Sequence, residues 1–132
     1  MKGIRIAAAV AGGLLALVFA GLGIAFLAGA LPEPPAPPEG TPIAHFMTAM
    51  MPTGYMTFVK VWEVIGGLLI AWPRTRRLGL LVLGPIVLNI LAFHWFIGGT
   101  AGVNDPMVAA VTVLVLFLAW VEREAFLRFA RG

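Results

Sequence analysis

Two ionisable side chains, Lys60 and Glu63, lie within an otherwise apolar stretch that is typical of a membrane-spanning helix. A charge in hydrocarbon is costly, so charged side chains inside a span usually mark a ligand, an ion or a proton path. The spacing i, i+3 puts both groups on one face of a helix, where they can reach each other or one ligand. We therefore expect a ligand-binding site centred on this pair. The alternative is an ion pair that only fixes helix register.

Two further polar residues, Asn89 and His94, lie in the next apolar stretch. The short basic turn at residues 73–77 makes the two helices antiparallel neighbours. With about 1.5 Å of rise per residue, Lys60 and His94 share an outer layer, and Glu63 and Asn89 share a layer near the membrane midplane. Asn89 and His94 are about 140° apart around a helix, so both line one cavity only at a kink or at a pocket edge.

A histidine and methionine cluster precedes this pair of helices. Thioether and imidazole ligands suit Cu(I), whereas a methionine-rich segment that packs adaptably at the membrane interface explains the same residues. The residues of this possible metal site are His45, Met47, Met50 and Met51. The sequence carries no other metal signature and none for haem. Three ring-bearing side chains are secondary candidates for the ligand site: Tyr55, Trp62 and His45.

Composition predicts an integral membrane protein. Of the 132 residues, 61% are hydrophobic and only 11% are charged, whereas a soluble domain carries about 25% charged residues. The net charge of +3 does not indicate a nucleic-acid partner, because the basic residues flank apolar stretches and form no continuous stripe. The chain has no cysteine, which excludes thiolate nucleophiles, disulfide exchange and iron–sulfur ligation by its own residues.

The apolar stretches predict an all-α fold, a single transmembrane domain built as a four-helix bundle. Each stretch approaches the roughly 20 residues that a span requires, and the expected spans are residues 4–30, 53–72, 78–97 and 106–121. A proline-rich outer loop (31–42) and an interfacial segment (43–51) connect the first two spans, and an amphipathic basic tail (122–132) ends the chain.

Local signals refine these spans. Thr53 is an expected N-cap, and Asp105 caps a helix that begins at a proline. Pro85 predicts a kink or break in the third span, and the glycine-rich residues 98–102 predict an irregular loop. The pair Gly66-Gly67 predicts close approach of another helix rather than of a ligand.

Basic residues fall on one side of the four-span topology. They flank the spans at the two chain ends and at the turn after the second span, and Lys60 is the only one left over. The opposite side carries acidic residues: Glu33, Glu39 and Asp105. The positive-inside rule therefore predicts that both termini are cytoplasmic.

Three motifs together resemble the DoxX family: Gly54-Tyr55, Lys60-x-x-Glu63-x-x-Gly66-Gly67-x-Leu69 and Gly84-Pro85-x-x-x-Asn89-x-x-x-Phe93-His94. The resemblance extends from Phe46 into the fourth apolar stretch. It implies a small, multi-pass, four-helix protein of the bacterial inner (cytoplasmic) membrane. Some members of the family are subunits of a thiosulfate:quinone oxidoreductase, and others are linked to membrane complexes that counter oxidative stress.

These observations lead to one main hypothesis and two alternatives. The main one is a quinone-binding subunit of a membrane redox complex, in which Lys60, Asn89 and His94 donate hydrogen bonds and Glu63 relays protons. Because the chain shows no electron-carrying site of its own, a redox partner subunit or a bound cofactor would supply electrons, and whether the chain is an enzyme stays open. The alternatives are a non-catalytic scaffold that binds partners or forms a homo-oligomer through the Ala/Gly faces of its first helix, and a small transporter with a broken third helix.

Overall fold

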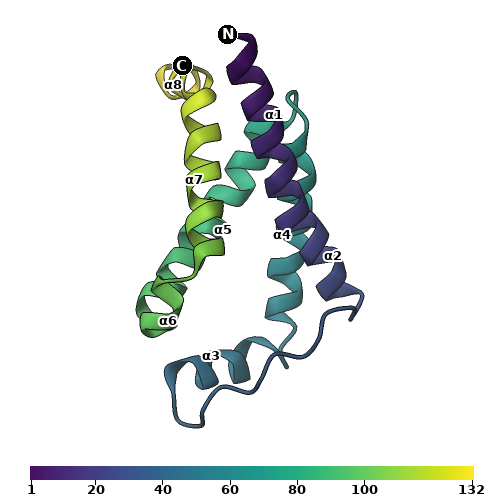
Figure 1. Ribbon diagram of the computed structural model, residues 1–132, viewed down its shortest axis with the longest axis vertical. Coiled ribbons are helices and arrows are strands. Elements are labelled where there is room, and N and C mark those ends of the chain that lie inside the picture. The colour runs from purple at the N-terminus through teal and green to yellow at the C-terminus, as the bar shows by residue number, and fades with distance from the viewer.

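Helices form all the regular secondary structure in the computed structural model, which describes residues 1–132 apart from the side chain of Ala101. The all-α class is therefore confirmed. In chain order the helices are α1 Lys2–Ala16, η1 Leu17–Gly21, α2 Leu22–Leu27, α3 Pro42–Met50, α4 Tyr55–Ala71, α5 Arg76–Phe96, α6 Gly99–Val103, α7 Pro106–Val121 and α8 Arg123–Arg131 (Figure 1).

The first three elements form one helical run from Lys2 to Leu27, close to the expected residues 4–30. The run stops before Gly29, whose φ of +66° lies in the left-handed region that favours glycine. Its middle part, η1, is a π-helix. No local sequence signal predicts this segment, and π-helical segments often mark functional sites.

α4 and α5 are antiparallel neighbours, as expected, and their mutual packing is the most extensive in the molecule (Figure 1). A β-carbon on Gly66 would lie 2.6 Å from the Leu83 side chain, and one on Gly67 would lie 2.7 Å from the Ala20 backbone nitrogen. The two glycines therefore let α5 and η1 approach different sides of α4, which confirms their predicted role in helix packing.

Two expected features of these helices differ in the structure. The predicted break at Pro85 is absent, since α5 continues through Pro85 as one helix, because the loss of one hydrogen-bond donor does not outweigh the bonds on either side of it. The N-cap of α4 is Gly54, at φ +77°, and not Thr53. The Thr53 hydroxyl instead donates a hydrogen bond to the Ala49 carbonyl oxygen at 2.7 Å, so it terminates the preceding helix.

The expected start of α7 is confirmed, since Asp105 Oδ1 accepts a hydrogen bond from the Met107 backbone N–H at 2.8 Å. The predicted basic tail forms α8, which bends by 60° from α7. The expected loop at residues 98–102 is instead the short helix α6. Gly98 and Gly102 make this turn possible, because their missing side chains leave room for His94.

The interfacial segment expected at residues 43–51 is the helix α3, which bends by 81° from α4. Its N-cap Thr41 accepts a hydrogen bond from the Ala44 backbone N–H at 3.3 Å. The proline-rich residues that precede Thr41 form no helix, as their composition predicts. α3 therefore crosses one end of the molecule, opposite the end that carries both termini (Figure 1).

Tight packing is concentrated in the half of the molecule nearest the termini. The largest fully buried side chains come one each from α1, α4, α5 and α7: Leu15, Ile70, Leu83 and Leu118. Because the chain direction alternates between these helices, the four residues lie between the middle of the molecule and the end formed by the termini and the α4–α5 turn. The half nearest α3 lacks an equivalent cluster of fully buried side chains within the described residues, and it is there that a cavity lies.

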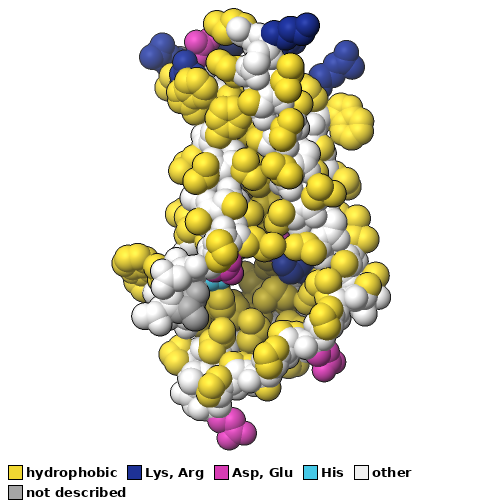
Figure 2. Space-filling model, in the orientation of Figure 1, with side chains coloured by type: hydrophobic (Ala, Val, Ile, Leu, Met, Phe, Trp, Pro, Cys, Tyr) yellow, Lys and Arg dark blue, Asp and Glu magenta, His cyan; other side chains and the backbone are white. Residues whose placement is uncertain are grey.

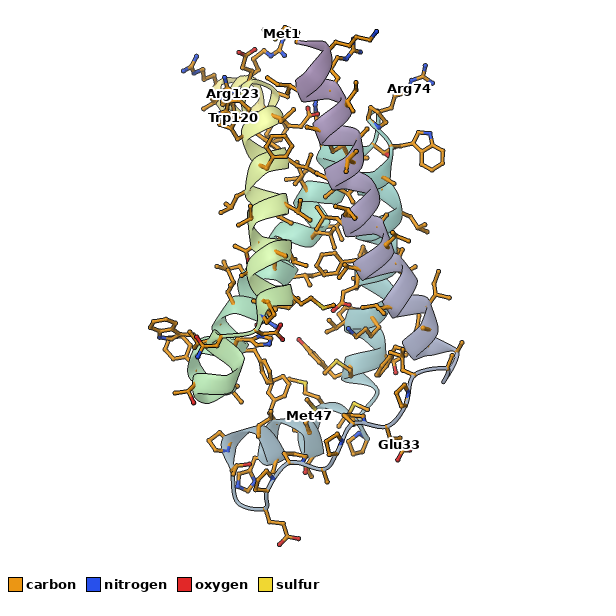
Figure 3. The ribbon with its side chains drawn as sticks, in the orientation of Figure 1. Met1, Glu33, Met47, Arg74, Trp120 and Arg123 are labelled. Atoms are coloured by element: carbon orange, nitrogen blue, oxygen red, sulfur yellow. The ribbon has the colours of Figure 1, made fainter. Side chains whose placement is uncertain are left out.

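Length and composition identify candidate membrane spans. Two helices, Lys2–Leu27 and Arg76–Phe96, are long and apolar enough to cross a membrane, and the number of such spans rises to four if each bent pair is counted as one span. Charge is separated along the longest axis of the molecule, because most Lys and Arg side chains gather at the end with both termini (Figure 2). Met1, Arg74 and Arg123 lie at that end, and Glu33 lies toward the other (Figure 3).

Candidate ligand-binding site

A cavity of about 380 Å³ lies between the long helices on the α3 side. It opens as a hollow bordered by acidic, basic and histidine side chains (Figure 2). Its walls come from η1, α2, α4, α5 and α7, and α3 closes one end with Phe46, Met47 and Met50 (Figure 3). Most lining side chains are apolar, and the structure brings all four primary candidates to this cavity: Lys60, Glu63, Asn89 and His94.

Lys60 and Glu63 form an ion pair within one turn of α4. Lys60 Nζ lies 2.7 Å from Glu63 Oε2, and the side chains are 25% and 8% exposed. The ammonium group also lies 5.8 Å from the centre of the Phe26 ring, within the range of a cation–π contact. Glu63 is thus the buried partner, while Lys60 keeps access to the cavity. The ion pair alone is compatible with either the ligand-binding or the structural interpretation.

His94 differs from the expectation that it donates to a ligand. Its Nδ1 lies 2.8 Å from the Ile90 carbonyl oxygen, and because a carbonyl only accepts, Nδ1 carries the proton. In the neutral ring, Nε2 therefore offers a lone pair. The Phe93 ring packs edge-on against the imidazole and also contacts the Phe46 ring of α3, at an interplanar angle of 50°. His94 is thus held in place by these neighbours, and its neutral form has an acceptor at Nε2.

Asn89 lies at the edge of the cavity. Its side chain is exposed, and it also lines a second, more open groove on the outer side of α4 and α5, which we call the α4–α5 groove. The expected edge position therefore explains how Asn89 and His94 line the same cavity, and no break at Pro85 is required. The residues of the α4–α5 groove are Tyr55, Phe58, Val59, Trp62, Val82, Pro85, Ile86 and Asn89.

The secondary candidates are divided between several places. Tyr55 lines both the cavity and the α4–α5 groove, whereas Trp62 lines only the groove. His45 is exposed on α3 and lines neither. The possible copper ligands are also separated, because Met47 and Met50 line the cavity while His45 and Met51 do not. Among the described residues, no group of three or more His, Cys, Asp or Glu side chains is placed to hold a metal ion.

Sequence reasoning missed two parts of the wall. Asp105 was recognised only as a helix cap, yet it also lines the cavity beside the start of α7. The first helical run contributes Val18, Phe19 and Leu22, although residues 6–27 contain no polar side chain that would mark them as part of a site. Only the acidic character of Asp105, next to a predicted outer helix end, could have drawn attention to it. The apolar wall residues carry no sequence signal.

Comparison with known proteins supplies one relative. The uncharacterized protein YwoB of Bacillus subtilis (strain 168) is 30% identical over 77 residues, which are 58% of this chain and 48% of that protein. The chain thus spans about half the length of the curated relative it matches. No family model and no solved structure matches the chain.

Proposed function

We propose that this chain is a DoxX-like protein of the bacterial inner membrane that binds a quinone or a similar lipophilic molecule as a subunit of a redox or oxidative-stress complex. The observation that carries the proposal is the convergence of an ion pair, an amide and an imidazole on one largely apolar cavity. Its volume of about 380 Å³ lies within the roughly 300–1,000 Å³ that is usual for small-molecule sites.

The cavity walls suit a molecule with a polar head and an apolar body. Lys60 and Asn89 supply donors for the carbonyl oxygens of a quinone, and the Glu63 carboxylate lies next to Lys60 as a proton carrier. Phe19, Val111 and the α3 methionines supply apolar contacts for the rest of the ligand. These roles are those expected from the resemblance, with His94 changed from donor to acceptor.

The proposal includes a four-span topology in which α4 and α7 cross the membrane together with the two longer helices. With 17 and 16 residues, they extend about 26 and 24 Å at 1.5 Å per residue, somewhat less than the roughly 30 Å hydrocarbon core. The basic end supports cytoplasmic termini by the positive-inside rule. α3 then covers the cavity at the outer surface.

Electrons would come from elsewhere in such a complex. The chain has no cysteine, and its described His, Asp and Glu side chains form no metal-binding group. We therefore assign the redox centre to a partner subunit and give this chain the role of binding the lipophilic substrate.

The test is binding of a decyl-substituted benzoquinone to the purified protein in lipid nanodiscs, measured by equilibrium dialysis. Val108→Trp fills the cavity from α7 without removing a polar group, and Val113→Trp adds the same ring on a side chain that is 64% exposed. We expect saturable binding that Val108→Trp and Lys60→Ala reduce at least tenfold and Val113→Trp leaves unchanged. Equal binding to all four proteins would contradict the proposal.

A second candidate function, partner binding, is favoured by the α4–α5 groove. It exposes the Asn89 amide beside the aromatic residues Phe58 and Trp62, and an amide in hydrocarbon gains from a hydrogen bond to another helix. The small-residue face of the first helix is less available, since Ala8, Ala11 and Gly12 are buried within the chain.

Crosslinking from Phe58→Cys in membranes tests for a partner or a second copy. The transporter alternative loses its main support, because α5 is continuous.

A further inference from the structure

The charges that line the cavity do not balance. Lys60 and Glu63 neutralise each other at 2.7 Å. Asp105 lines the same cavity, and within the described residues no Lys, Arg or His nitrogen lies within ion-pair distance of its carboxylate. The cavity thus holds two carboxylates and one ammonium group, and the excess negative charge lies beside α7.

Besides the donors of Lys60, Asn89 and Tyr55, the cavity offers unused acceptors. Glu63 uses Oε2 for Lys60, and Asp105 uses Oδ1 for the Met107 backbone N–H. The other oxygen of each carboxylate accepts no hydrogen bond from a described protein donor, neither atom is fully buried, and both residues line the cavity. His94 adds the lone pair of Nε2, since Nδ1 donates to Ile90.

From these positions we infer that the cavity selects a lipophilic molecule whose head group donates hydrogen bonds, namely a phenol or the quinol form of a quinone. This inference rests on the proposed function and adds the chemical class of the ligand. A hydroxyl group can donate to the free oxygen of Glu63 or Asp105, or to His94 Nε2. A quinone carbonyl has no hydrogen to offer, so against these atoms it meets only lone pairs and negative charge. Lys60 and Asn89 can serve either form.

The test compares two probes that differ only at the head group, 4-decylphenol and 4-decylanisole. The ether has almost the same shape and apolar body but no hydroxyl hydrogen. In nanodiscs of zwitterionic lipid, we expect the phenol to bind about tenfold more tightly or better, the order expected for one hydrogen bond to a charged acceptor. Decyltrimethylammonium, a cation without a donor, serves as the third probe.

Variants then locate the acceptor. Asp105→Asn removes the negative charge and keeps a good N-cap for α7. Glu63→Gln removes the negative charge of the ion pair and keeps a side chain of similar shape. We expect at least one of them to reduce the phenol-to-anisole affinity ratio several-fold. Glu33→Gln, in the proline-rich segment outside the cavity, should leave the ratio unchanged.

Each outcome distinguishes the inference from the proposed function. If neither the decyl benzoquinone nor any of the three probes binds to the wild-type protein, the proposed function fails, and this inference fails with it. If the benzoquinone binds but the phenol does not, the inference alone is overturned. If phenol and anisole bind equally well, the site is lipophilic but does not select donors, and the inference alone is overturned. The same holds if decyltrimethylammonium binds more tightly than the phenol, or if neither carboxylate variant changes the ratio.

Discussion

Gly67 of α4 packs so closely against Ala20 of η1 that a β-carbon at Gly67 would lie 2.7 Å from the Ala20 backbone nitrogen. The contact joins the π-helical segment to the helix that carries the ion pair. It therefore fixes the position of the first helical run against the cavity.

Gly67→Ala should destabilise the protein by about 1–3 kcal/mol, because backbone on both sides must separate to admit the methyl group. Gly13→Ala is the control, since a β-carbon there meets nothing within 4 Å. It should be neutral or stabilising by up to about 1 kcal/mol through helix propensity. Thermal unfolding in detergent measures both variants, and equal stability would show that the helices are not in close contact.

Lys60→Met should destabilise the protein more than Glu63→Gln does. The first change leaves a buried carboxylate without its partner, at a cost of about 2 kcal/mol or more. The second leaves an ammonium group whose side chain is 25% exposed and can turn toward the cavity. The double variant Lys60→Met/Glu63→Gln should recover part of the loss, and strictly additive effects in the cycle would mean that the pair is not coupled.

Glu122→Gln should destabilise the end of the molecule that carries the termini. Glu122 Oε2 lies 2.8 Å from Arg77 Nε, and Oε1 lies 3.9 Å from Arg76 Nη1. Arg76 is 5% exposed, and its Nε and Nη2 atoms make no hydrogen bond to a described protein atom. Removing the carboxylate leaves a buried guanidinium uncompensated.

Arg76→Met separates this electrostatic effect from packing. The methionine retains much of the apolar stem and removes the unpaired nitrogens. We therefore expect Arg76→Met to change the free energy of unfolding little, and we expect Glu122→Gln to destabilise the Arg76→Met protein much less than the wild type. Chemical or thermal unfolding of the single and double variants provides the cycle. A large loss of stability from Arg76→Met alone would indicate that the Arg76 guanidinium makes favourable hydrogen bonds in the folded protein.

Gly54→Ala should disturb α3 and weaken ligand binding. Gly54 has a φ of +77°, where an L-residue costs about 1–2 kcal/mol, and it lies at the bend of 81° between α3 and α4. Gly84→Ala, in open space within α5, is the matched control. Dialysis with the decyl benzoquinone should show weaker binding for Gly54→Ala only.

The sequence was most informative where hydrophobic patterning and turn chemistry agree. The limits of α7, the helix cap at Asp105 and the neighbouring positions of α4 and α5 follow from local signals. The meeting of Lys60 with Asn89 and His94 at one cavity follows from depth along two antiparallel helices, so it too could be anticipated. The function of that cavity stays a prediction.

The remaining features depend on packing between distant segments. The π-helix η1 arises in a run of ordinary apolar residues, and nothing local marks it. Trp62 faces the α4–α5 groove instead of the cavity because of the rotation of α4 about its axis, which composition does not encode. The contact between Lys60 and Phe26 likewise requires knowledge of where α2 lies.

The unequal lengths of the helices have a consequence for the surrounding bilayer. The first run of 26 residues extends about 39 Å, whereas α4 and α7 extend about 26 and 24 Å. If these elements cross together, the first must tilt and the bilayer must thin beside the other two. The mismatch of α4 and α7 would then be smallest in thin membranes, whereas the first run would have to tilt more, so acyl-chain length should tune both the stability of the protein and the width of its cavity.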